Sequence, residues 1–121
     1  MEKENIKFKA KRLDGKGWAI GDLLHSYENG AIIVPIEGGG AFSVDPETVC
    51  QYTGLKDCEG NEIWEGDIVE REIYDLFKGS SKVKAVIVYM DGAFVAITDG
   101  IPYSLYFKYI TVIGNKFDKE K

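Results

Sequence analysis

Turn-forming residues are densest in residues 44–69, VDPETVCQYTGLKDCEGNEIWEGDIV, and this run limits the fold more than any other segment. Asp45-Pro46 starts a tight turn, and Thr53-Gly54 and the segment 58–61 predict two more turns. Gly66-Asp67 then leads into an apolar strand that begins at Ile68. The run predicts a β-rich fold, and it contains no catalytic constellation.

The N-terminal half alternates apolar and polar residues with a period of two, as half-buried strands do. In residues 6–11, IKFKAK, every second residue is a lysine, which predicts a strand with one apolar and one cationic face. Asp14-Gly15 and Asn29-Gly30 are hairpin signals because these residues tolerate positive φ. Asp45-Pro46 is expected to begin one helical turn, with Asp45 as its cap. We therefore expect an antiparallel β-meander over residues 1–50.

The C-terminal half repeats this pattern. Asp91-Gly92 and Asp99-Gly100 predict hairpin turns, and residues 75–81 are interpreted as a polar loop. Several short strands separated by glycine-rich turns fit a small barrel over residues 51–115, followed by a charged tail, 116–121, that frays. The predicted strands are Ile68–Tyr74, Val83–Met90, Ala93–Thr98 and Tyr109–Ile113.

Three segments resemble the YopX family, small proteins carried by bacteriophages and prophages. The central one fits VDPETV-x-QYTGL-x-D-x-x-G-x-x-I-x-EGDIV, the N-terminal FKAKRLDGKGW is similar to the family's opening, and VIGN at 112–115 resembles its close. Lys9 and Cys50 depart from the residues that the family often has. The motif residues, which we expect to be structural, are Gln51, Tyr52, Thr53, Gly54, Leu55, Asp57, Gly60, Ile63, Glu65, Gly66 and Asp67.

The resemblance implies an all-β fold, which we predict as an N-terminal antiparallel meander sheet packed on a C-terminal SH3-like barrel. It also implies a tendency to self-associate. It implies no activity, because the function of the family is uncharacterised.

The length of 121 residues suits one domain, or two small subdomains that share a core. Cys50 and Cys58 are expected to be reduced, because the N-terminal segment lacks the apolar core of a secretory signal. The longest apolar stretches are too short to cross a bilayer. We therefore expect a soluble protein in the cytoplasm of a bacterial host cell, with no membrane partner.

The net charge of −5 is unevenly distributed along the chain. Residues 1–16 carry +3, residues 17–77 carry −11, and residues 78–121 carry +3. The basic ends could fold back onto the acidic middle, or a basic face of one protomer could meet an acidic face of another. The third alternative is that all these side chains are solvated surface, where ion pairs contribute little.

Few residues suit catalysis or metal binding. His25 is the only histidine, so with two cysteines it cannot make a four-ligand zinc site. Cys58 lies between Asp57 and Glu59, whose charges disfavour its thiolate. The run 38–40 of three glycines is interpreted as a flexible link, because no phosphate-binding motif follows it. We therefore expect no enzyme activity, no catalytic residue, no cofactor and no metal.

One acidic cluster deserves comparison with a metal or acid–base site. Its spacing does not match the calcium-binding pattern D-x-[DN]-x-[DN]-G. Acidic residues in turns more often cap backbone amides or face water, so we prefer a structural interpretation. The cluster consists of Asp57, Glu59, Glu62, Glu65 and Asp67.

Two hypotheses of function remain. The first is a phage accessory protein that works by protein–protein contact and self-assembly, with itself or with a phage or host protein, and with Trp64 as a possible contact. The alternative is a nucleic-acid-binding module that uses the barrel half and stacks bases on aromatic side chains. The negative charge of residues 17–77 disfavours non-specific binding of nucleic-acid phosphates. We therefore expect nucleic-acid binding to be weak and confined to residues 7–12 or to Lys82 and Lys84. The candidate stacking residues are Trp18, Tyr27, Tyr52, Trp64, Tyr74, Tyr89, Tyr103, Tyr106 and Tyr109.

Overall fold

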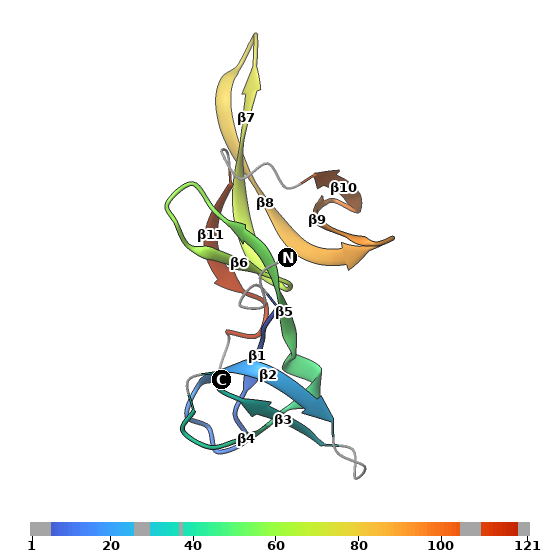
Figure 1. The fold of residues 1–121 in the computed structure, drawn as a ribbon. Coiled ribbons are helices and arrows are strands. Elements are labelled where there is room, and N and C mark those ends of the chain that lie inside the picture. The colour runs from blue at the N-terminus through green and yellow to red at the C-terminus, as the bar shows by residue number, and fades with distance from the viewer. Residues whose placement is uncertain (1–5, 26–29, 37, 105–109, 119–121) are drawn as a thin grey trace. The chain divides into compact units, whose positions relative to one another are not determined.

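The computed structural model describes residues 6–25, 30–36, 38–104 and 110–118, and these form an all-β chain with one short 3-10 helix (Figure 1). The all-β prediction is confirmed. The predicted stacking residues Tyr27, Tyr106 and Tyr109, and Asn29 of a predicted turn, lie outside the described residues. The elements are β1 (Phe8–Lys11), β2 (Trp18–His25), β3 (Ala31–Val34), β4 (Phe42–Val44), η2 (Pro46–Thr48), β5 (Cys50–Lys56), β6 (Glu62–Trp64), β7 (Asp67–Asp75), β8 (Gly79–Met90), β9 (Ala93–Thr98), β10 (Ile101–Ser104) and β11 (Ile110–Asn115).

The described strands form two antiparallel sheets. Six strands lie in the order β4-β3-β2-β1-β5-β6, and five lie in the order β10-β9-β8-β7-β11. The chain also divides into two compact units, which we call unit 1 (residues 1–52) and unit 2 (residues 53–121). Strand β5 passes from one unit to the other. The prediction that the two halves pack on each other stays a prediction.

Unit 1 contains the predicted meander, with β1 to β4 paired in chain order. Alternation along the strands buries small and β-branched side chains on one face, and Phe8, Leu23, Phe42 and Val49 pack against that core. Gly21 allows the backbone of β2 to lie close to that of β3, because a Cβ on Gly21 would lie 2.2 Å from the carbonyl oxygen of Val34. The buried core residues are Ala10, Ala19, Ala31, Ile33 and Val44.

The predicted helical turn is confirmed as η2. Asp45 is its cap, with Oδ1 accepting a hydrogen bond of 3.0 Å from the amide of Glu47, and Pro46 occupies the first position. Thr48 connects this turn to the sheet, since its Oγ1 accepts a hydrogen bond of 2.8 Å from the amide of Lys11.

Unit 2 is built from hairpins around a second core. The predicted turns at Asp91-Gly92 and Asp99-Gly100 are confirmed, because all four residues have positive φ, between 52° and 88°. Positive φ at both central residues matches the right-handed twist of the paired strands. Phe94 and Val112 pack against the buried core residues, which are Ile63, Val69, Ala85, Ile87, Ala96 and Ile110.

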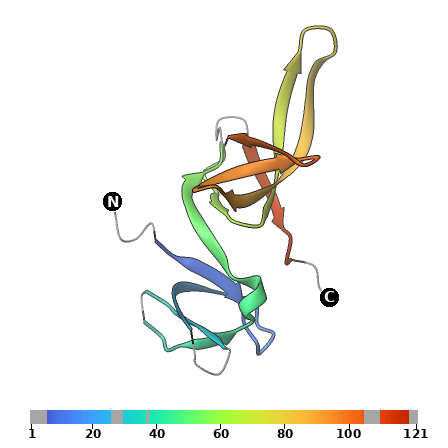
Figure 2. The ribbon, with the colours of Figure 1, turned by 90° about the vertical axis from the view of Figure 1, so that its right-hand side faces the viewer.

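The predicted loop at 75–81 is wrong. Strand β7 continues to Asp75 and β8 begins at Gly79, so only residues 76–78 connect them. The pairing extends from Ile68↔Val86 to Asp75↔Gly79 and places Glu72 opposite Lys82. Opposite charges across a ladder favour pairing, a signal that is missed when each strand is read alone. The β7–β8 hairpin extends beyond the other strands of unit 2 in both views (Figures 1 and 2).

The predicted SH3-like barrel over 51–115 is also wrong. Strands β7 to β11 form an open sheet with β10 and β11 at its edges, and no sheet of the described residues closes. To close this sheet into a barrel, its two edge strands would have to pair with each other. Instead, β5 and β6 belong to the other sheet, and the pairing of β11 with β7 shifts between Val112 and Gly114.

Residues 116–118, at the start of the tail that is expected to fray, form a hydrogen-bonded turn. The amide of Lys116 donates to the carbonyl of Gly66 at 2.9 Å, and the amide of Asp118 donates to the carbonyl of Asn115 at 2.9 Å. Residues 119–121 lie outside the described residues. Across the described ranges, no helix combines the length and apolar character needed to span a bilayer.

Candidate functional site

The central motif is divided between the two units. Gln51 pairs with Phe8 of β1, and the amide of Tyr52 donates to the carbonyl of Lys7 at 2.9 Å, so both belong to the sheet of unit 1. Thr53 begins unit 2, where its Oγ1 donates to the carbonyl of Ile63 at 2.7 Å and accepts from the amide of Leu55 at 3.1 Å. Thr53 thereby connects β5 to β6, a role that its place in the sequence does not predict.

Asp57 organises the turn after β5. Its side chain is 4% exposed, and Oδ1 accepts hydrogen bonds from the amides of Glu59 (2.9 Å) and Asn61 (2.8 Å). Oδ2 accepts from the Asn61 side-chain amide at 3.3 Å and from the backbone amide of Val112 in β11 at 2.8 Å. One carboxylate therefore closes a tight turn and holds the C-terminal strand.

The same contacts determine the charge state of Asp57. Burial raises the pKa of this carboxyl, but the hydrogen bonds from the amides of Val112, Asn61 and Glu59 more than offset burial and lower the pKa below its ordinary value of 3.8. Asp57 is therefore an anion bound by backbone amides. These amides occupy its oxygen atoms, so it is poorly suited to act as a general base.

Asp67 makes a second connection to β11. Its side chain is 2% exposed; Oδ2 accepts from the amide of Trp64 at 2.7 Å, and Oδ1 accepts from the side-chain amide of Asn115 at 2.9 Å. Gly66 adds backbone bonds, because its amide donates to the carbonyl of Ile87 and its carbonyl accepts from Lys116. We call residues 57–67 the clasp, because they bind the C-terminal strand in unit 2.

Trp64, the candidate contact residue of the motif, is 4% exposed. Its amide is bound by Asp67, and it ends β6. We therefore place no partner contact on its indole ring. The other acidic residues of the cluster, Glu59, Glu62 and Glu65, do not join Asp57 and Asp67 in one site: within the described residues, no group of three His, Cys, Asp or Glu side chains could hold a metal ion.

Three motif glycines have a backbone conformation that other residues rarely adopt. Gly54, Gly60 and Gly66 have φ of 88°, 88° and 87°. At Gly54 an added Cβ would meet no atom within 4 Å, so the cost of a side chain there comes from the backbone conformation and not from a clash.

We expect Gly54→Val and Gly66→Val each to lower the free energy of unfolding by about 1–3 kcal/mol, because a β-branched residue is strained at positive φ. Glu59→Gln, an exposed side chain on a neighbouring turn, is the control and should change it by less than about 0.5 kcal/mol. Thermal unfolding of the three variants measures this difference. Unchanged midpoints in both glycine variants would contradict the prediction.

A cationic face lies on β1 in unit 1. The ammonium groups of Lys9 and Lys11 lie 4.5 and 5.1 Å from the centre of the Trp18 ring, and that of Lys7 lies 4.9 Å from the centre of the Tyr52 ring. The two-residue period places these three lysines on one side of the strand, as predicted. This side of β1 therefore carries three cations, each beside an aromatic ring.

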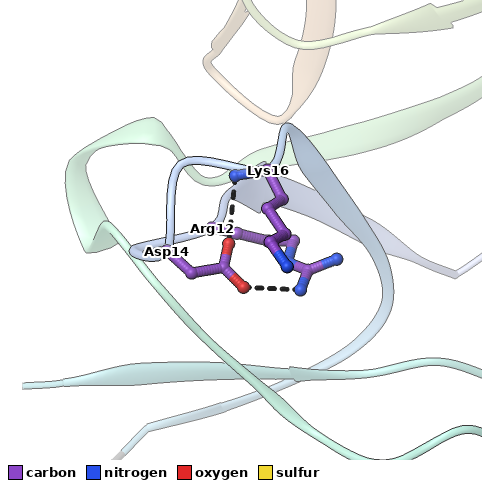
Figure 3. Close-up of polar contacts among 3 residues, drawn as sticks. All are labelled: Arg12, Asp14 and Lys16. Carbon is purple, nitrogen blue, oxygen red and sulfur yellow. Dashed lines mark hydrogen bonds and ion pairs between the residues drawn. The ribbon is translucent and has the colours of Figure 1, made fainter.

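The turn after β1 holds a charged network, shown in Figure 3. The carboxylate of Asp14 accepts hydrogen bonds from the Arg12 guanidinium and from the amide of Lys16, and the Arg12 bond lowers the pKa of Asp14. The guanidinium of Arg12 also lies 4.1 Å from the centre of the Phe42 ring. Beside it is an open hollow of about 410 Å³, lined by Leu13, Asp14, Ala41, Phe42 and Ser43.

The tip of the β7–β8 hairpin carries the most exposed apolar side chains among the described residues. Leu76 is 82% exposed and Phe77 is 96% exposed, and Tyr74 nearby is also largely exposed. This surface is not predicted from the sequence, because residues 75–81 have the composition of a polar loop. The sequence feature that could have indicated an exposed hairpin tip is the pair Leu76-Phe77, which lies between two segments of alternating polarity.

The two cysteines differ in environment. Cys50 is buried and its thiol donates to the carbonyl of Thr48 at 3.3 Å, whereas Cys58 is exposed; neither forms a disulfide.

Among known protein families, the model described as YopX protein matches residues 5–120. The match includes the clasp and its partners in β11. No curated protein matches the chain significantly.

Proposed function

The chain belongs to the YopX family, and we propose that it is a cytoplasmic phage or prophage accessory protein that works by protein–protein contact and self-assembly and not by catalysis. The observation that carries this proposal is the exposed apolar tip of the β7–β8 hairpin. Clustered exposed apolar side chains on a soluble domain are typical of interaction sites, and aromatic residues are enriched in the centres of interfaces.

The chemistry of the clasp supports the same proposal. Asp57 and Asp67, the two buried carboxylates of the motif, accept hydrogen bonds from backbone or amide groups of unit 2. Carboxylates used in this way stabilise a fold, and acid–base chemistry requires groups that can reach a substrate. We therefore assign the family motif to stability and the function to the exposed surface.

We expect light scattering to give a mass above that of one chain at tens of micromolar protein, at both low and moderate salt. Apolar contacts persist when salt screens charges, so moderate salt should not dissociate the assembly. The mass of a single chain under both conditions would contradict self-assembly.

The alternative function is weak nucleic-acid binding on the cationic face of β1. Lys7, Lys9 and Lys11 support it because they are presented on one side of a strand. The net charge of −5 opposes it, since affinity for nucleic acid depends on clustered cations. Gel-shift titration with single-stranded DNA at two salt concentrations separates the two functions: binding that falls steeply with salt and disappears when the three lysines are changed to Glu would favour the alternative.

A further inference from the structure

We draw no further inference here: the strongest candidate, the exposed apolar patch that Leu76 and Phe77 form at the tip of the β7–β8 hairpin, carries none because nothing in the described residues shows what covers it.

Discussion

Replacing Asp57 with Ala is expected to lower the free energy of unfolding by about 3–5 kcal/mol, because several hydrogen bonds to one buried carboxylate are lost. The amides of Glu59, Asn61 and Val112 would lose an acceptor, and the connection between the turn and β11 would be broken. Chemical denaturation at neutral pH measures the effect. Asp57→Asn should be intermediate, because one acceptor oxygen remains while the other becomes a donor facing donors.

Glu59→Gln is the matched control for Asp57, since it changes an exposed acid two residues away. It should alter the free energy of unfolding by less than about 0.5 kcal/mol. A loss below about 1 kcal/mol in Asp57→Ala would show that this carboxylate does not hold the strand.

The pH dependence provides a second readout of the same prediction. The pKa of Asp57 is lowered in the folded chain, so its carboxylate contributes stability above the ordinary value of 3.8, and that contribution disappears as the pH falls through the lower, folded value. The difference in stability between the original chain and Asp57→Ala should therefore be constant near neutral pH and shrink below about pH 4. A difference that stays constant down to pH 2 would contradict the assigned role.

Replacing Asp67 with Ala is expected to lower the free energy of unfolding by about 2–4 kcal/mol. Asp67 is the more deeply buried of the two motif carboxylates, and its loss leaves the Trp64 amide and the Asn115 side chain without this acceptor inside unit 2. Chemical denaturation measures the loss, and Asn115→Ala completes a double-mutant cycle. We expect a coupling energy of about 1–2 kcal/mol between the two residues, and additive effects would contradict a direct contact.

Local chemistry explains the predictions that succeeded. The two Asp-Gly turns have positive φ at both residues, and Asp45 caps the turn that Pro46 begins, because each feature depends on residues adjacent in sequence. The alternation in residues 6–11 likewise produces a strand with its lysines on one side. The family motif was recognisable for the same reason, since its turn residues are nearly contiguous.

The roles of the two motif aspartates were only half predictable. A turn-forming role was expected for acids of this kind, and Asp57 does cap the amides of its own turn. Its contact with Val112 spans 55 residues, and the contact of Asp67 with Asn115 spans 48. Neither contact can be predicted from local sequence, because burial and hydrogen bonding between distant strands depend on how the strands pair.

The all-β character, the turns and the short capped helix can be predicted from local sequence, because φ preferences and alternating polarity act over a few residues. Three other features depend on how distant strands pair: the five-stranded sheet stays open, β7 and β8 extend into a long hairpin with an exposed Leu76-Phe77 tip, and residues 116–118 fold back on Gly66. Each of these depends on which strand edges meet and which opposite charges face each other across a ladder. Such pairings are chosen by the free energy of the whole fold, to which distant segments contribute as much as neighbours.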